Sequence, residues 1–202
     1  MNPLIAFFLI SLPLFGDQFF QDKLGQEIRL AVVRSADEIV LDQGKDILVK
    51  SFMNGYEDVP LAELNPNFKC IGDVRRFYEN YFESELGHFK KGELIWVQAF
   101  AGDQLVGWAT FHLEAKELDA AYMNLLIVDP DYQRRGIGEA LVFSIRSDDL
   151  FPNLQAINVL IRKVNQKGRI FYHKIGFIDF DYKGEDNYVD NSLLTGLRWE
   201  KK

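Results

Sequence analysis

The stretch "VDPDYQRRGIGEAL", residues 128–141, decides the fold of this chain. It follows an apolar run over residues 120–128 that is typical of a buried strand, and it leads into a helical pattern from Ile137. The first N–H groups of a helix have no partner inside the helix, and the helix dipole adds partial positive charge there. Gly136 and Gly138 let that backbone approach a phosphate without a Cβ in the way. The stretch therefore predicts an anion-binding turn.

Two common phosphate-binding motifs do not fit this turn. A Walker loop ends in Gly-Lys-Ser/Thr, which is missing here, and the dinucleotide fingerprint needs a third glycine where Leu141 stands. Arg134 and Arg135 add positive charge that suits a pyrophosphate. Alternatively, the two arginines form a solvated pair, and their backbone matters more than their side chains.

The order of the expected elements predicts a mixed α/β sheet of about six to seven strands, flanked by about four helices. Gly102-Asp103 marks a hairpin, and Ser35 with Glu38 forms a possible capping box for the first helix. We expect strands at residues 27–34, 93–100, 104–114, 120–128, 156–161, 176–182 and 191–199, and helices at residues 36–52, 70–89, 137–147 and 166–175.

Composition narrows the class of protein. The chain has 202 residues, a size that fits one globular domain, and a net charge of −7, which argues against nucleic-acid binding. An acidic chain with acidic and aromatic residues at 54–68 and 183–188 suits a cationic partner; alternatively, these two segments are ordinary solvated loops. The single cysteine, Cys70, is expected to be a buried structural thiol. No Cys/His spacing predicts a metal site.

The N-terminal apolar run, residues 4–15, has two interpretations. It is too short for a membrane helix, which needs about 20 residues, and it has the length of a signal-peptide core. No basic residue precedes it, and the cleavage site is poor, which favours a segment that packs on the domain or on a partner chain. We therefore expect an N-terminal segment at 1–26, one domain at 27–202, a cytoplasmic location (with export as the alternative) and a possible homodimer.

Two motifs in the right order identify a family resemblance. Gln133-x-x-Gly136-x-Gly138 after the strand resembles the acetyl-CoA-binding motif of the GNAT superfamily of N-acetyltransferases. Asn165, Tyr172 and then Gly176-Phe177 resemble the N-x₆-Y-x₃-G-F segment of the same family. The resemblance covers about residues 94–180 well, and the first 90 residues only through the order of their elements.

The resemblance implies a GNAT-like fold and an enzyme that moves an acetyl group from acetyl-CoA to a primary amine by direct attack, without a metal. It implies that Tyr172 protonates the departing thiolate and that Asn165 hydrogen-bonds the cosubstrate. Alternatively, Asn165 is a helix N-cap and Tyr172 packs in the core. The implied cosubstrate-binding backbone comprises Leu126, Ile127 and Val128 for the pantetheine arm, and the motif from Gln133 through Arg134, Arg135, Gly136, Ile137, Gly138 and Glu139 for the pyrophosphate.

The general base is the open question. Many family members carry a Glu on one of the two central strands, and the corresponding positions here are Asn124 and Leu160, which cannot accept a proton at neutral pH. His112, Glu114 or a chain of water molecules are the alternatives. A second hypothesis follows from this gap: a non-catalytic acyl-CoA-binding or sensory module of the same fold.

Overall fold

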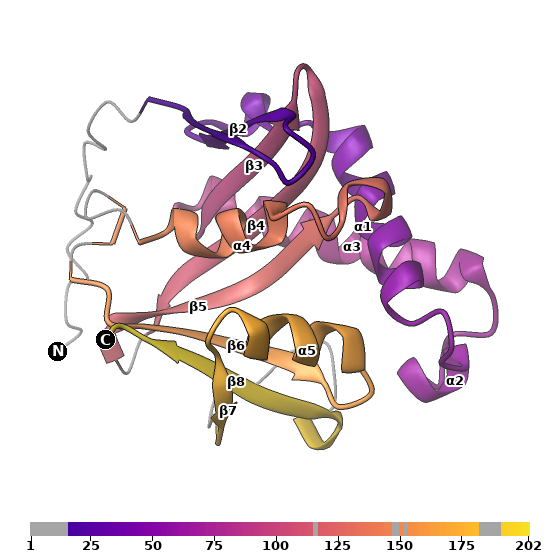
Figure 1. Cartoon of the computed structure of the whole chain (residues 1–202). Coiled ribbons are helices and arrows are strands. Elements are labelled where there is room, and N and C mark those ends of the chain that lie inside the picture. Colours follow the sequence, from indigo (N-terminus) through magenta and orange to yellow (C-terminus); the bar gives the residue numbers. More distant parts are fainter. Residues whose placement is uncertain (1–15, 115–116, 147–149, 152, 182–190) are drawn as a thin grey trace, which may run out of the picture.

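The computed structural model describes residues 16–114, 117–146, 150–151, 153–181 and 191–202 (Figure 1). The predicted apolar run at 4–15 and the loop at 183–188 lie outside these residues. The described residues form a mixed sheet of eight strands in the order β1-β2-β3-β4-β5-β6-β8-β7, together with five α-helices. The strands are β1 (Gln18–Gln21), β2 (Glu27–Val32), β3 (Ile95–Ala101), β4 (Gln104–Glu114), β5 (Glu117–Val128), β6 (Ala156–Arg162), β7 (Ile178–Phe180) and β8 (Leu194–Glu200). The helices are α1 (Leu41–Gly55), α2 (Leu61–Leu64), α3 (Ile71–Lys90), α4 (Ile137–Ser144) and α5 (Gln166–Lys174).

The predicted mixed α/β sheet is confirmed, with one more strand than expected. The additional strand is β1, which pairs with β2 in antiparallel register from Gln18↔Leu30 to Gln21↔Glu27. It lies within residues 1–26, for which the sequence predicts only a single N-terminal segment. Within the described residues, no helix combines the length and the apolar character needed to cross a bilayer.

The first helix begins later than predicted. Residues Ala36–Glu38 form a 3₁₀ turn, and α1 starts only at Leu41. The side chain of Gln98 on β3 lies between the two, donating to the Glu38 carbonyl at 3.0 Å and accepting from the Val40 N–H at 3.0 Å. A strand side chain thus satisfies backbone groups that a continuous helix would have paired internally.

Cys70 also differs from the prediction of a buried thiol. It is exposed and occupies the N-cap of α3, where its backbone N–H donates to the Asp73 carboxylate at 3.1 Å. Cysteine is among the most often buried residue types, which explains the wrong expectation. Its position is set by the helix cap and not by the core.

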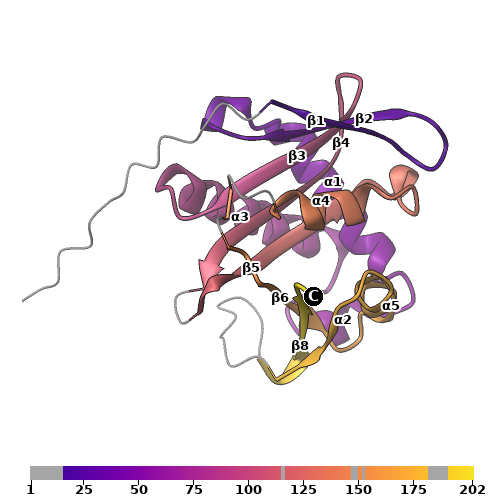
Figure 2. The same ribbon diagram turned by 60° about the vertical axis from the view of Figure 1, so that its left-hand side comes forward.

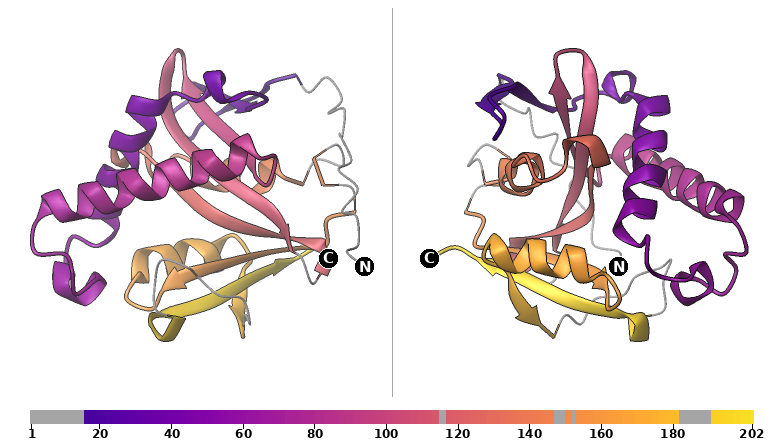
Figure 3. Two further views of the ribbon diagram at one scale, coloured as in Figure 1. Left: turned by 180° about the vertical axis from the view of Figure 1, so that it is seen from behind. Right: turned by 45° about the vertical axis from the view of Figure 1, so that its right-hand side comes forward.

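Each face of the sheet carries its own apolar core and its own helices (Figure 3). Helices α1 and α3 cover one face, where Phe82 packs edge-on against the stacked rings of Trp96 and Trp108. Helices α4 and α5 cover the other face, to which Leu141 and Tyr172 contribute buried side chains. Because β5 alternates between the two faces, Ile127 belongs to the first core and Val128 to the second.

The central strands β5 and β6 pair over a short stretch and then separate (Figure 1). Their parallel register runs from Ala120↔Ala156 to Tyr122↔Asn158. Beyond this point β5 pairs only with β4, as far as Val128, and β6 pairs only with β8. Asn124 is an extra residue in β5, because Thr110 on β4 is opposite Leu125 while the next pair is Phe111↔Met123. The sheet therefore opens next to a β-bulge.

Gly107 on β4 permits the backbone of β5 and the side chain of Leu141 to lie close to β4. A Cβ at Gly107 would lie 2.7 Å from the Ile127 carbonyl oxygen and 3.2 Å from Leu141 Cδ1. We expect Gly107→Ala to destabilise the fold by about 1–3 kcal/mol, as overpacking does. Gly87 on α3 has no neighbouring atom within 4 Å of the place where a Cβ would lie, so Gly87→Ala is the matched control and should stabilise by about 0.5–1 kcal/mol. Urea unfolding measures both, and a Gly107→Ala midpoint equal to that of the native protein contradicts the expectation.

Candidate functional site

The loop between β5 and α4 has the strained geometry of a ligand-binding turn. Asp129 begins it, and its carboxylate accepts from the Asp131 N–H at 3.0 Å. Arg134 has φ +62° and Gly136 has φ +96°, both in the left-handed region. For Arg134 this conformation is unfavourable by about 1–3 kcal/mol, and such strain concentrates at functional sites. Gly136 is the N-cap of α4 and has no side chain with which to cap the helix.

A row of free backbone donors follows from this geometry. Ala140 N–H donates to the Gly136 carbonyl at 3.0 Å, which is the first helical bond of α4. Among the described residues, no acceptor lies opposite the N–H groups from Arg134 to Glu139. These donors, which we call the amide cradle, sit at the positive end of the helix dipole. Unpaired N–H groups in this arrangement fit a diphosphate.

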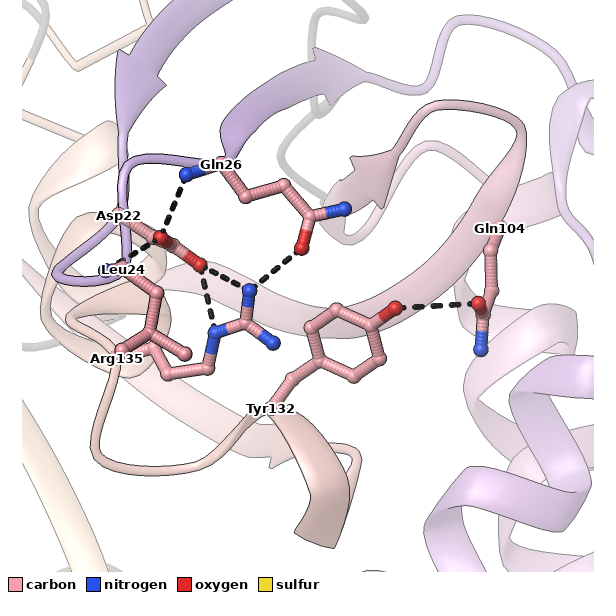
Figure 4. Close-up of polar contacts among 6 residues, drawn as sticks. All are labelled: Asp22, Leu24, Gln26, Gln104, Tyr132 and Arg135. Atoms are coloured by element: carbon pink, nitrogen blue, oxygen red, sulfur yellow. Dashed lines mark hydrogen bonds and ion pairs between the residues drawn. The ribbon is translucent and has the colours of Figure 1, made fainter.

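The side chain of Arg135 points away from the cradle and into the hairpin formed by β1 and β2 (Figure 4). Its Nε donates to the Asp22 carboxylate at 2.6 Å, and its Nη2 donates to the Gln26 side chain at 2.5 Å. The Asp22 carboxylate is fully buried and also accepts from the N–H groups of Leu24 and Gln26 at 2.8 and 2.9 Å. The charge of Arg135 is therefore balanced by Asp22, while Arg134 remains exposed.

The hairpin holds the backbone of the loop as well as its side chain. Lys23 N–H donates to the Arg135 carbonyl at 3.1 Å, which places the β1–β2 turn beside the amide cradle (Figure 2). The Tyr132 ring lies 4.5 Å from the Arg135 guanidinium, and its hydroxyl bonds to Gln104 at 3.2 Å. Residues 22–26, which belong to the predicted N-terminal segment, thus position the predicted anion site.

The remaining motif residues also have defined positions. Gln133 donates from Nε2 to the Val128 carbonyl at 3.1 Å, so its side chain fixes the end of β5. A Cβ at Gly138 would lie 3.3 Å from the Phe171 ring of α5, which shows how tightly the two helices meet there. Leu126, Ile127 and Val128 pair with β4 only, and their other backbone edge faces the opening.

Asn165 and Tyr172 lie on α5, across the opening from β5. Asn165 accepts from the Gly168 N–H at 2.8 Å, so the helix-capping alternative is confirmed for its Oδ1 atom. Tyr172 is 7% exposed and packs 5.2 Å from the Phe177 ring. Burial raises the pKa of the Tyr172 hydroxyl far above its usual value, and the neighbouring Tyr56 phenol adds to the shift. Tyr172 is therefore held neutral, as a proton donor must be.

Tyr56 joins the two helical layers at this place. It follows the last residue of α1, and burial raises its pKa to about 12, partly offset by Arg162 and by a hydrogen bond from Asn165. Lys167 on α5 donates to the Asn54 carbonyl at 3.1 Å and pairs with Glu57. Helices from opposite faces of the sheet meet here, where β5 and β6 have separated.

The structure places the candidate bases at different distances from the opening. His112 packs against Tyr122, with ring centroids 5.1 Å apart, at the end where β5 and β6 are still paired. Glu114 lies further along β4, in register with Glu117. Asn124 is at the bulge, and its side chain donates to Glu85 of α3 at 3.2 Å. Glu85 is not among the residues predicted from the sequence, although an acidic residue on the apolar stripe of a helix is a visible signal.

Comparison with protein families gives one match to more than half of the chain. Residues 59–177 match the model described as Acetyltransferase (GNAT) family. The chain belongs to the GNAT acetyltransferase family. A search of curated proteins found none that matches this chain at a significant level of sequence similarity.

Solved structures share the GNAT fold at low sequence identity. The PaiA N-acetyltransferase of Thermoplasma acidophilum, solved with coenzyme A, is 18% identical with a TM-score of 0.65 over 86% of this chain and 99% of its own. An acetyltransferase of Bacillus subtilis in complex with CoA is 14% identical, with a TM-score of 0.54 over 87% of this chain and 99% of its own. The ribosomal-protein-S18-alanine N-acetyltransferase of Escherichia coli is 16% identical, with a TM-score of 0.55 over 86% of this chain and 93% of its own. The described residues contain no group of three or more His, Cys, Asp or Glu side chains suited to a metal ion.

The ion pair between Asp22 and Arg135 predicts a pH-dependent stability. Burial would raise the pKa of Asp22, but the N–H groups of Gln26 and Leu24 and the Arg135 guanidinium together hold it below the usual value. A carboxyl with a lowered folded pKa stabilises the fold above its unfolded pKa, about 3.9, and loses that contribution as the pH falls through the folded value. Asp22→Asn should therefore lower the free energy of unfolding at pH 7, and the deficit should shrink near pH 3.

Urea titrations of both proteins at the two pH values measure this difference. Asp103→Asn, at the exposed turn between β3 and β4, is the control and should behave like the native protein at both. A deficit of Asp22→Asn that is the same at pH 7 and pH 3 would show that the charge of Asp22 does not stabilise the hairpin.

Proposed function

We propose that the protein is an acetyl-CoA-dependent N-acetyltransferase that acetylates a primary amine by direct attack, without an acyl-enzyme. The observation that carries the proposal is the amide cradle, which combines unpaired N–H groups from Arg134 to Glu139 with the start of α4. The cradle lies at the end of β5, where that strand has no neighbour on the β6 side. Coenzyme A in two structures of the same fold supports this interpretation.

The cradle, the free edge of β5 and the opening match the diphosphate, the pantetheine arm and the thioester of acetyl-CoA, in that order. The amide cradle would hold the diphosphate, and the unpaired backbone edge of Leu126, Ile127 and Val128 would bind the pantetheine arm as an added strand does. Acetyl-CoA supplies the acetyl group as an activated thioester. The thioester would then lie in the opening between β5 and β6, next to Tyr172 of α5 and Tyr56 at the end of α1.

The chemistry requires three proton transfers. An ammonium must lose a proton before its nitrogen attacks the thioester carbon, the nitrogen must lose a second proton once the C–N bond has formed, and the departing thiolate must gain one. When the C–N bond has formed and the C–S bond breaks, Tyr172 would give its phenolic proton to the sulfur and recover a proton from solvent. The products are the N-acetyl amine and CoA thiol, with one proton released for each ammonium acetylated.

The acceptor is proposed as a cationic amine, because the chain has a net charge of −7 and carries Glu57, Asp58 and Glu63 in the segment that follows Tyr56. A cytoplasmic location follows from the proposed need for acetyl-CoA. The second hypothesis, a CoA-binding module without activity, is favoured by the lack of a carboxylate at Asn124 and Leu160. Release of CoA thiol with a panel of amines separates the two.

Ligand-induced stabilisation tests the cradle. CoA should raise the melting temperature, by the equivalent of about 2.7 kcal/mol at a hundredfold excess over its Kd, whereas AMP and NAD should have little effect. Gly138→Val should remove the shift, because its side chain would project beside the Phe171 ring into the loop. Gly55→Ala, at the open end of α1, is the control and should keep it. An undiminished CoA shift in Gly138→Val would mean that the loop is not the cradle.

Removal of the Tyr172 hydroxyl tests the acid. Tyr172→Phe should lower kcat by about 10²-fold while the Kd for CoA stays near normal, because only the phenolic proton is lost. Since burial raises the pKa of Tyr172, this group should stay protonated through about pH 10 and cause no loss of rate below it. The rate of thiol release, measured for both proteins between neutral pH and about pH 10, tests the lower kcat of the variant and the absence of a loss of rate through ionisation of Tyr172. Equal turnover in the variant would remove Tyr172 from the mechanism.

A further inference from the structure

Helix α3 places one carboxylate in the core behind the opening. The buried stripe of this helix consists of Val74, Tyr78, Phe82, Glu85 and Leu86. Glu85 is 2% exposed, and the other members of the stripe are apolar or aromatic. A carboxylate on such a stripe is unfavourable unless its oxygens are hydrogen-bonded, so its partners indicate its purpose.

Two hydrogen-bond partners of Glu85 come from the two strands at the bulge. Thr110 on β4 donates from Oγ1 to Glu85 at 2.6 Å, and Asn124 on β5 donates from Nδ2 at 3.2 and 3.4 Å to the two carboxylate oxygens. Asn124 is the extra residue of the β-bulge, two positions beyond the last pair of β5 with β6 at Tyr122. The carboxylate therefore lies where the sheet opens.

The Asn124 carboxamide has a second, unsatisfied atom. Its Oδ1 is buried and has no hydrogen-bond partner among the described residues. An ionised carboxylate only accepts hydrogen bonds, which requires the Asn124 NH₂ group to face Glu85 and leaves Oδ1 without a donor. A buried acceptor of this kind points to a donor that arrives with a ligand.

We propose that Glu85 is the general base of the acetyl transfer and that the acceptor ammonium binds between its carboxylate and Asn124 Oδ1. This inference rests on the proposed function and assigns the base that it lacks. An ammonium group carries three N–H donors, so one can bond to Asn124 Oδ1 and another to Glu85. The base thus comes from a helix on one face of the sheet, whereas neither Asn124 nor Leu160 on the central strands can accept a proton.

The proton balance is complete without another reactant. Glu85 takes one proton from the ammonium, and the neutral amine uses its freed lone pair to form the C–N bond. The nitrogen then carries a positive charge and gives its second proton to solvent as the C–S bond breaks, while Tyr172 protonates the sulfur and recovers a proton from solvent. Thr110 and Asn124 can both reverse their hydrogen bonds, since a hydroxyl and a carboxamide each donate and accept. They can therefore stabilise Glu85 as a carboxylate and as a carboxylic acid. Glu85 returns its proton to solvent after the product leaves.

Glu85→Gln is the test, because it keeps the size of the side chain and removes its basicity. Thiol release should be measured with a lysyl ε-amine, whose pKa is about 10.4, and with a peptide α-amine, whose pKa is about 8. We expect kcat to fall by about 10²-fold for the ε-amine with an unchanged Kd for CoA. The ratio of native to variant rate should be smaller for the α-amine, which is more often neutral near physiological pH. Glu79→Gln, a half-buried position on the same helix, is the matched control and should be unaffected.

The dependence on amine basicity separates a base from a structural carboxylate. A loss of the same size for both amines, or unchanged rates in Glu85→Gln, overturns the assignment. The double variant Glu85→Gln/Asn124→Glu, which returns a carboxylate to the bulge from β5, should recover part of the lost rate for the ε-amine. Native protein that binds CoA but releases no thiol with any amine overturns the proposed function itself, and the assignment with it.

Discussion

The rest of the structure depends on the early end of pairing between β5 and β6. Two parallel strands that stay paired leave no backbone edge for a ligand, whereas here the register stops at Tyr122↔Asn158 and each strand continues with its antiparallel partner. The antiparallel pairs β4–β5 and β6–β8 keep the two halves of the sheet rigid beyond that point. Gly107 lets β5 lie close to β4, and the extra residue Asn124 changes the direction of β5 locally. The opening is therefore supported from both sides.

An opening of this kind exposes polar backbone groups, and contacts with the β1–β2 hairpin fix their positions. The N–H groups from Arg134 to Glu139 have no partner among the described residues and are left to bond with water or a ligand. The β1–β2 hairpin fixes them from outside, through Lys23 to the Arg135 carbonyl and through Asp22 to the Arg135 guanidinium (Figure 4). The second arginine of the motif is thus needed for the shape of the cradle, while the donors themselves are backbone amides.

The sequence predicted most of the sheet and the glycine turn before α4, because both leave local signals. Apolar runs bounded by turn residues indicated seven of the strands, and Gly136 and Gly138 between a strand and a helix indicated the cradle. The brace on the cradle could not be predicted, because Asp22 and Arg135 are far apart in the chain and meet only through the β1–β2 pairing. The late start of α1 has the same origin, since Gln98 from β3 takes over the backbone groups of Glu38 and Val40.

The two groups proposed for catalysis, Tyr172 and Glu85, illustrate why the candidate site was only half predictable. Tyr172 lies on the face covered by α4 and α5 and was visible through its spacing from Asn165, whereas Glu85 lies on the face covered by α1 and α3 (Figure 3). Its partner Asn124 was noted only as the wrong residue for a base. If the acid and the base work from opposite faces, the reacting carbonyl must lie within the plane of the sheet, between the separated strands. In the proposed mechanism, direct transfer would follow from this arrangement, because the amine and the thioester would enter the opening from different sides and meet inside it.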